Sequence, residues 1–188
     1  MTPQPSTCDD FAAWLDLARE VEPLFGPMVA DQQFREGLRN AMATGEAIGI
    51  RSADTLAGGI VVARAANEIH WLAVAQVCRG QGLGRLLLEA ALATLDRTQA
   101  ISVQTFAPDV AAGLPARKLY QAFGFKDSAA AGPNPAGIPT VIMVRAADNK
   151  SAGTGPHAPL PEDRRKSVMK PHRAAKATIR MGAAPYSS

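Results

Sequence analysis

Apolar and polar residues are arranged along the chain in patterns that predict both strands and helices. The segment Glu68–Val74 is mostly apolar and includes Ile, Trp and Val, which is typical of a buried strand. Beyond a glycine-rich turn, apolar residues recur at helical intervals, which predicts a helix with one apolar face. The residues of that face are Leu83, Leu86, Leu87, Ala90, Ala91 and Leu95. The pattern therefore predicts a strand, a turn and a helix in succession.

The remaining segments complete a mixed order of helices and strands. Asp9 and Asp10 predict the start of a helix that runs to about Glu20, and Pro23 is expected to break it. The other predicted elements are a helix at 31–43, strands at 47–51, 56–64, 101–106 and 141–145, and a helix at 116–123. An antiparallel run of strands, a central strand–turn–helix unit and a late helix with final strands indicate an α+β fold with a mixed sheet.

The turn between the central strand and helix has the composition of a phosphate-binding site. It reads Arg79-Gly80-Gln81-Gly82-Leu83-Gly84-Arg85. The start of a helix leaves backbone N–H groups unpaired and carries partial positive charge. Glycines let a phosphate approach those donors closely because they have no Cβ. The two arginines add charged contacts on either side, so the turn is predicted to hold a pyrophosphate.

Spacing excludes two common phosphate-binding motifs. The string G-x-x-x-x-G-K-[ST] does not occur. The dinucleotide fingerprint G-x-G-x-x-G fails because its third glycine would fall on Arg85 or on Leu87. The pattern that fits is [Q/R]-x-x-G-x-[G/A], with Arg79, Gly82 and Gly84 at its defined positions.

This pattern resembles the acetyl-CoA signature of the GNAT superfamily of N-acetyltransferases. The strand that precedes it, with eight positions from Val74 to Gly82, matches the usual lead-in of that family. A second block, ARKLYQAFGF at 116–125, is similar to the family segment [AR]-x-L-Y-x-x-x-G-F. The resemblance covers about residues 9–145. It implies a mostly antiparallel, twisted sheet flanked by helices, and direct attack of a primary amine on acetyl-CoA in a ternary complex.

The resemblance also implies which residues bind acetyl-CoA, the expected cosubstrate. The pantetheine amides are expected along the end of the central strand, and the pyrophosphate on the glycine turn. The expected cofactor-binding residues are Leu72, Ala73, Val74, Arg79, Gly80, Gln81, Gly82, Leu83, Gly84 and Arg85. No metal is expected.

Three residues are candidates for proton transfer. Tyr120 matches the family position of a general acid for the CoA thiolate, although a half-buried packing role is the alternative. Glu68, by its spacing to Val74, matches a glutamate that some members use as a base through water. His70 is the rival base because histidine titrates near neutrality, and water or another group is a further alternative. Both are expected to share one strand face with Leu72.

Three residues near the tyrosine complete the second block. Arg117 and Lys118 are expected to be surface or phosphate-side charges. Many family members have a cofactor-contacting asparagine seven residues before the tyrosine, and Gly113 stands there instead. The loop before the tyrosine is therefore expected to be remodelled. The acceptor pocket is expected between the N-terminal helices, residues 25–34 and the loop 106–115.

Composition divides the chain into a domain and a tail. The sequence has 188 residues and 47% hydrophobic content, which suits one domain at 1–146 with a real core. Residues 1–146 carry 12 Lys and Arg against 14 Asp and Glu, whereas 147–188 carry 8 against 3. Because 147–188 combine a Pro/Gly-rich linker with a basic segment poor in large apolar residues, this tail is expected to be disordered.

The tail leaves a second function open. A basic tail is either solvated or binds a polyanion such as nucleic acid. The alternative to an enzyme is therefore a non-catalytic acyl-CoA-binding sensor with a polyanion-binding tail. Neither a signal peptide nor a membrane-spanning run is recognised, so a cytoplasmic protein is expected. Cys8 and Cys78 lack metal or disulfide spacing. The acceptor is expected to be a small-molecule or peptide amine, and a homodimer is compatible with the sequence.

Overall fold

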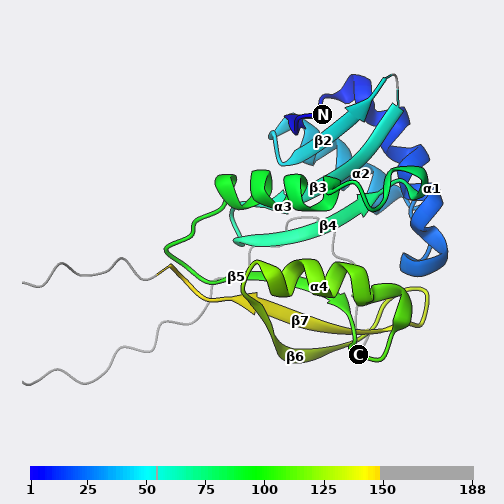
Figure 1. The fold of residues 1–188 in the computed structure, drawn as a ribbon. Helices are drawn as coiled ribbons and strands as arrows, with labels where there is room; N and C mark the ends of the chain where they lie inside the picture. Colours follow the sequence, from blue (N-terminus) through cyan, green and yellow to red (C-terminus); the bar gives the residue numbers. More distant parts are fainter. Residues whose placement is uncertain (54, 149–188) are drawn as a thin grey trace, which may run out of the picture.

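In the computed structural model, which describes residues 1–53 and 55–148, seven strands form one sheet in the order β1-β2-β3-β4-β5-β7-β6 (Figure 1). The strands are β1 (Gln4–Pro5), β2 (Ala47–Ser52), β3 (Thr55–Ala63), β4 (Glu68–Val74), β5 (Ile101–Phe106), β6 (Phe125–Pro133) and β7 (Pro139–Arg145). The helices are α1 (Phe11–Phe25), α2 (Gln32–Ala43), α3 (Leu83–Thr94) and α4 (Leu114–Ala122). Only β4 and β5 pair in parallel, so the predicted α+β fold with a mostly antiparallel sheet is confirmed.

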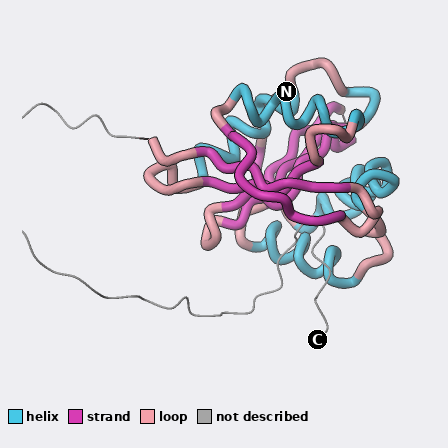
Figure 2. The backbone as a smooth tube through the Cα atoms, turned by 90° about the horizontal axis from the view of Figure 1, so that it is seen from below, coloured by secondary structure: helices cyan, strands magenta, loops and turns pink. Residues whose placement is uncertain are grey.

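Helices cover both faces of this sheet. The first core lies between the sheet and α3 and α4, and the second lies between the sheet and α1 and α2. Figure 2 shows the helices on opposite sides of the strands, which twist across one another. The sheet separates the two cores, so alternate residues of β3 and β4 contribute to different cores, and Cys78, outside the sheet, packs against both.

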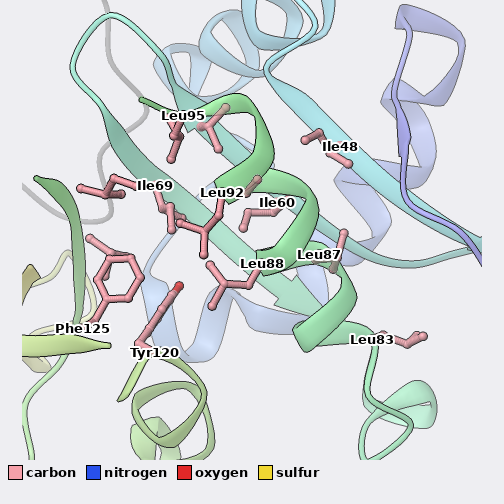
Figure 3. Close-up of a cluster of buried hydrophobic side chains, with 14 of the residues drawn as sticks. Ile48, Ile60, Ile69, Leu83, Leu87, Leu88, Leu92, Leu95, Tyr120 and Phe125 are labelled. Atoms are coloured by element: carbon pink, nitrogen blue, oxygen red, sulfur yellow. The ribbon is translucent and has the colours of Figure 1, made fainter. Parts of the chain in front are cut away.

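The buried stripe of α3 differs from the predicted one. Leu86 is 36% exposed, whereas Leu88 and Leu92 are buried. Figure 3 shows Leu88 and Leu92 on the side of α3 that faces Tyr120 and Phe125. The stripe as observed comprises Leu83, Leu87, Leu88, Ala91, Leu92 and Leu95. Both stripes fit a helical period, so the position of the sheet and α4 decides which leucines are covered.

Helix α1 continues past Pro23, where the sequence predicted a break. Pro23 has no N–H and cannot bond to the Arg19 carbonyl, but the helix extends only two residues beyond it, to Phe25. The helix ends at Gly26, whose positive φ of 95° suits glycine and whose N–H bonds to the Glu22 carbonyl at 2.8 Å. The Glu22 carboxylate accepts bonds of 2.7 Å from the N–H groups of Met28 and Val29. These contacts hold the chain where it leaves the helix.

The sequence analysis did not predict two edge strands. Strand β1 has two residues and pairs only with β2. Strand β6 is mostly exposed, pairs only with β7, and its register with β7 is irregular at two points. Neither strand shows alternating apolar residues, because hydrogen bonds to one neighbour rather than burial hold it in place.

Strands β4 and β5 are paired over only a short distance. Their parallel pairing is limited to Glu68 with Ser102 and Ile69 with Val103. Beyond this point the two strands diverge toward their C-terminal ends, as Figure 1 shows. The divergence leaves the second half of β4 without β5 as its neighbour in the sheet.

Strand β4 also contains a β-bulge. Trp71 pairs with Val61 and Ile69 pairs with Val62, so His70 is the extra residue on β4. A bulge shifts the alternation of side chains by one residue. An even-numbered residue before His70 and an even-numbered residue after it therefore face opposite sides of the sheet, and the same holds for odd-numbered residues.

Candidate active site

A cavity of about 510 Å³ lies where β4 and β5 have diverged. Its walls are the end of β4, the glycine turn, the start of α3, α4 and the C-terminal end of α1. Nine of the ten predicted cofactor-binding residues line it: Leu72, Ala73, Val74, Arg79, Gly80, Gly82, Leu83, Gly84 and Arg85. Gln81 does not, and its amide donates to the Val77 carbonyl at 3.5 Å. Helix α1 and the loop 106–115, which the sequence analysis expected around the acceptor pocket, line this same cavity. Their lining residues are Val21, Leu24, Phe25, Phe106, Ala112 and Pro115.

The backbone of the turn requires glycine at two positions. Gly80 and Gly82 have φ angles of 77° and 79°, in the left-handed region that L side chains rarely adopt. Gly82 is the N-cap of α3, and its carbonyl accepts bonds from Arg85 and Leu86 at 3.0 and 3.2 Å. A Cβ on Gly82 would have no protein atom within 4 Å. The space beside the helix start is therefore open to an anion.

The two arginines of the turn lie at the rim of the cavity. Arg79 donates from Nε to the Val74 carbonyl at 3.1 Å and so ties the turn to the end of β4. Arg85 pairs with Glu89 one turn along α3, at 2.9 Å, and its guanidinium lies 5.3 Å from the ring centre of Phe123. A guanidinium has five N–H donors, so these contacts leave capacity for a phosphate.

Tyr120 is buried in the core beneath α3 and α4. It is 3% exposed and lies edge-on to Phe125, with ring centres 5.6 Å apart (Figure 3). Burial raises the pKa of its hydroxyl well above the ordinary value of 10.0, so the hydroxyl keeps its proton at neutral pH. Tyr120 itself does not line the cavity, whereas Ala116 and Leu119, on the same side of α4, do.

Arg117 is a buried structural residue, so the expectation of a surface or phosphate-side charge is wrong. It is 5% exposed, and its NH2 group contacts both carboxylate oxygens of Asp127 on β6 at 2.8 and 2.9 Å. Its NH1 group donates to the Phe106 carbonyl at 3.0 Å. These bonds join α4 to the ends of β5 and β6. Lys118, in contrast, is exposed as expected.

Packing explains why the family asparagine is replaced at Gly113. A Cβ at Gly113 would lie 2.3 Å from the Cβ of Phe106, so no side chain fits there without movement. The predicted loop before the tyrosine is short: a 3-10 turn, Ala111–Gly113, leads directly into α4 at Leu114.

A second cavity of about 300 Å³ lies where β4 and β5 are still paired, before the two strands diverge. It is lined by Glu68, Ile69, His70, Ser102, Val103, Gln104 and Ile142. Glu68 Oε2 and His70 Nε2 are 3.3 Å apart, with 25% and 7% of the two side chains exposed. The structure therefore places both candidate bases in one cavity and in contact.

The expectation that these two residues share a face with Leu72 is wrong. Ile69 belongs to the core beneath α3, and Leu72 and Val74 pack against that core. Glu68 and His70 flank Ile69 and so face the other side of the sheet. The bulge at His70 causes the difference, because it reverses the alternation between the two halves of β4.

The two cavities follow one another along the same pair of strands. On β4, residues 68–70 line the smaller cavity and 72–74 line the larger one. On β5, residues 102–104 line the smaller cavity and Phe106 lines the larger one. A molecule in the larger cavity that extends along the gap would therefore reach toward Glu68 and His70.

Three further expectations concern other parts of the chain. Within residues 1–53 and 55–148, no group of three or more His, Cys, Asp or Glu is placed to hold a metal ion. Cys8 is exposed and Cys78 is half-buried, and neither forms a disulfide in this part of the chain. No helix of the described part is long and apolar enough to cross a membrane. The basic tail lies outside the described residues, apart from its first two.

Comparison with known families agrees with the geometry. Residues 17–146 match the acetyltransferase (GNAT) domain. The chain therefore belongs to the GNAT acetyltransferase family and is an acetyl-CoA-dependent acyltransferase. No curated protein sequence matches the chain.

Solved structures share the fold at low sequence identity. The ribosomal-protein-S18-alanine N-acetyltransferase from Escherichia coli is 18% identical, with a TM-score of 0.60 over 82% of this chain and 98% of that one. The yncA protein from Salmonella typhimurium, with its cofactor acetyl-CoA, is 14% identical, with a TM-score of 0.60 over 82% and 98%. The PaiA N-acetyltransferase from Thermoplasma acidophilum, in complex with coenzyme A, is 16% identical, with a TM-score of 0.57 over 77% and 97%.

Proposed function

We propose that the protein transfers the acetyl group of acetyl-CoA to a primary amine by direct attack in a ternary complex. The observation that carries the proposal is the succession of two cavities along β4 and β5, one at their paired part and one where they have diverged. One has the glycine turn at its wall, and the other contains a carboxylate and an imidazole. Two structural neighbours contain acetyl-CoA or coenzyme A, which supports the larger cavity as the cofactor site.

The cofactor is placed by main-chain groups and charge. The pantetheine amides would bond to the edge of β4 at Leu72–Val74, which β5 leaves uncovered after Ile69. The pyrophosphate would lie against Gly82 and the first N–H groups of α3, between Arg79 and Arg85. This arrangement directs the thioester along the gap toward the smaller cavity.

The attacking nitrogen must first lose a proton. Glu68 and His70 are in contact in the smaller cavity, so we assign them a shared role as base. One side chain accepts the proton of the amine, and the other orients that side chain and stabilises its protonated form. The neutral amine then attacks the acetyl carbonyl carbon, an amide bond forms and the C–S bond breaks. The nitrogen loses a second proton as the amide forms, and the leaving CoA thiolate gains one. We assign Tyr120 to this exchange: its hydroxyl gives a proton to the thiolate and is restored by the proton from the nitrogen, and water relays both because Tyr120 lies beside the larger cavity rather than in it.

Thiol release during incubation with acetyl-CoA and a panel of amines tests this function. We expect the thiol and an acetylated amine to appear in equal amounts. Glu68→Gln and His70→Gln should each lower kcat by about 10²–10⁴-fold, the usual size of a proton-transfer contribution. If they act as a unit, the double variant should be no slower than the slower single variant. Glu36→Gln, an exposed carboxylate on α2 outside both cavities, is the control and should retain full activity.

The same assay separates the enzyme from the alternative, a non-catalytic acyl-CoA-binding sensor. Calorimetric titration measures acetyl-CoA binding independently of turnover. Binding without thiol release across all amines would favour the sensor and contradict the transferase.

A further inference from the structure

We propose that the C-terminal end of α1 limits the length of the acyl group that the protein accepts from CoA, and that Asn134 holds this end in place. The limit is an acyl wall in the larger cavity, formed by Leu24, Phe25 and Phe106. The inference rests on the proposed function, because it takes this cavity as the site of acetyl-CoA. It adds a residue that positions the wall and a preference for acetyl over longer acyl groups.

The acyl wall lies at the end of the cavity where the thioester is expected. Strands β4 and β5 pair as far as Ile69 and Val103. Three residues further along each strand are Leu72 and Phe106, which are therefore about level where the strands have diverged. Because the pyrophosphate is expected at the glycine turn after β4, the pantetheine runs back along β4 and its thioester end comes closest to Leu72. Phe106 therefore lies on the side of the acyl group.

The acyl wall is apolar and is fixed from two sides. The Phe25 ring stacks on the Phe106 ring, with ring centres 5.2 Å apart. Phe106 is 4% exposed, and Arg117 donates to its carbonyl at 3.0 Å. The stacked pair joins the end of α1 to the end of β5 and bounds the cavity on the side of α1 (Figure 1). A methyl group can pack against such a wall, whereas a longer chain would have to displace it.

Asn134 connects the end of α1 to the turn between β6 and β7. Its side-chain nitrogen donates to the Leu24 carbonyl at 2.7 Å. Its side-chain oxygen accepts from the N–H groups of Ala136 and Ile138, each at 3.0 Å. Backbone N–H groups can only donate, so they determine which end of the amide faces the turn and which faces Leu24. One buried side chain therefore shapes the turn and holds α1.

Gly26 shows how closely this turn approaches α1. A Cβ on Gly26 would lie 2.6 Å from the Cβ of Pro135, so the two segments are in direct contact. Helix α1 packs on β3 and β4, whereas β6 and β7 follow β5 in the sheet. The turn thus holds α1 across the place where β4 and β5 have diverged. Its contacts with α1 determine how far the acyl wall stands from β4.

Calorimetric titration with acetyl-CoA, butyryl-CoA and free CoA, without any amine, tests the acyl wall. Wild type should bind butyryl-CoA roughly tenfold more weakly than acetyl-CoA, because two extra methylene groups overpack the site. Phe25→Ala should improve butyryl-CoA relative to acetyl-CoA by about 15-fold, from about fourfold for each methylene group that becomes buried. Free CoA has no acyl group, so its Kd should not change. Phe11→Ala, at the other end of α1 and outside both cavities, is the matched control and should leave all three affinities unchanged.

Asn134→Asp tests positioning, because it changes one contact only. The carboxylate can still accept from the turn, but it cannot donate to the Leu24 carbonyl. The ratio of the two acyl-CoA affinities should therefore shift toward butyryl-CoA, as in Phe25→Ala. Asn67→Asp is the control for a general loss of stability. Asn67 is also buried, donates to the Asp96 and Ala100 carbonyls and lies outside both cavities, so this variant should lower Tm without changing the ratio.

The outcomes distinguish this inference from the proposed function. If wild type binds butyryl-CoA as tightly as acetyl-CoA, or if Asn134→Asp and Asn67→Asp give the same ratio, the inference is overturned. If the Phe25 and Asn134 variants change the choice of amine but not the acyl-CoA ratio, the wall contacts the acceptor and the inference is also overturned. If the ratios shift as expected but no amine releases thiol, the transferase fails and the acyl wall stands.

Discussion

Replacing Gly82 by valine should abolish acetyl-CoA binding while the protein stays folded. Gly82 has a φ of 79° at the N-cap of α3. A branched side chain in this left-handed conformation costs roughly 1–2 kcal/mol. No protein atom lies within 4 Å of the added Cβ, so no packing clash increases this cost. At this size of chain, 1 kcal/mol lowers Tm by about 2–4 °C, and the domain should therefore remain folded.

The effect on binding should be much larger than the effect on stability. The added side chain enters the space beside the first N–H groups of α3, where the pyrophosphate is expected. Loss of a single hydrogen bond to a charged group weakens binding by about 1.5–3 kcal/mol, or roughly 10- to 150-fold in Kd. More than one such bond would be lost, so binding should fall below detection in calorimetric titration.

A second glycine provides the matched control. Gly45, after α2, has a φ of 69°, and a Cβ there would also meet nothing within 4 Å, but it lies outside both cavities. Gly45→Val should reproduce the fall in Tm and leave the Kd for acetyl-CoA unchanged. Equal affinity in a folded Gly82→Val protein would show that the pyrophosphate does not use this turn. If both variants lose the same affinity for acetyl-CoA, backbone strain at the substituted glycine, rather than steric exclusion of the pyrophosphate, is responsible for the loss.

Three further predictions test the acid, the pH dependence and the buried ion pair, and a fourth tests the tail. Tyr120→Phe should lower kcat by about 10²–10⁴-fold with little change in acetyl-CoA affinity, and wild-type turnover would reduce Tyr120 to a packing residue. Because the pKa of Tyr120 is raised on folding, its contribution to stability is present below pH 10.0, its ordinary pKa, and is lost as pH rises further. Urea unfolding of the Tyr120→Phe protein between pH 9 and 11 should therefore show a weaker decline than wild type. Asp127→Asn should lower the free energy of unfolding by about 1–3 kcal/mol, because it leaves the buried Arg117 without its charge partner although 43% of the Asp127 side chain is exposed and water can replace part of the contact, whereas Asp16→Asn, at an exposed pair on α1, should change it by less than about 1 kcal/mol. A protein that ends at Asn149 should keep its acetyl-CoA affinity and turnover, and only salt-sensitive binding to a polyanion should suffer; loss of turnover would show that 1–146 is not an independent domain.

Local sequence patterns were sufficient to predict which residues come together at the larger cavity. Strand β4 and strand β5 have their predicted bounds, and nine of the ten expected cofactor residues meet at one cavity. The reason is that a buried strand, a glycine turn and a helix start are specified over a few consecutive residues. Periodicity and positive φ angles act at that range, so the sequence expresses them directly.

Edge strands and helix faces were less predictable. Strand β6 depends on its pairing with β7, and the exposed Leu86 of α3 fits the helical period as well as the buried Leu88 does. In both cases the local pattern is compatible with two structures: 125–133 as strand or loop, and either set of leucines on α3 as the buried one. Contacts with segments distant in the sequence determine which of the two forms.

The composition of the smaller cavity was decided by tertiary structure. The sequence alone determined that Glu68 and His70 stand near the start of a strand, but the bulge at His70 places them opposite Leu72, in contact with one another and beside Gln104. Likewise, the sequence predicts Arg117 as a surface charge, because its partners, Asp127 and the Phe106 carbonyl, lie next to it only in the folded protein. A bulge and a buried ion pair depend on register and on partners far along the chain, and these form only when the whole sheet packs.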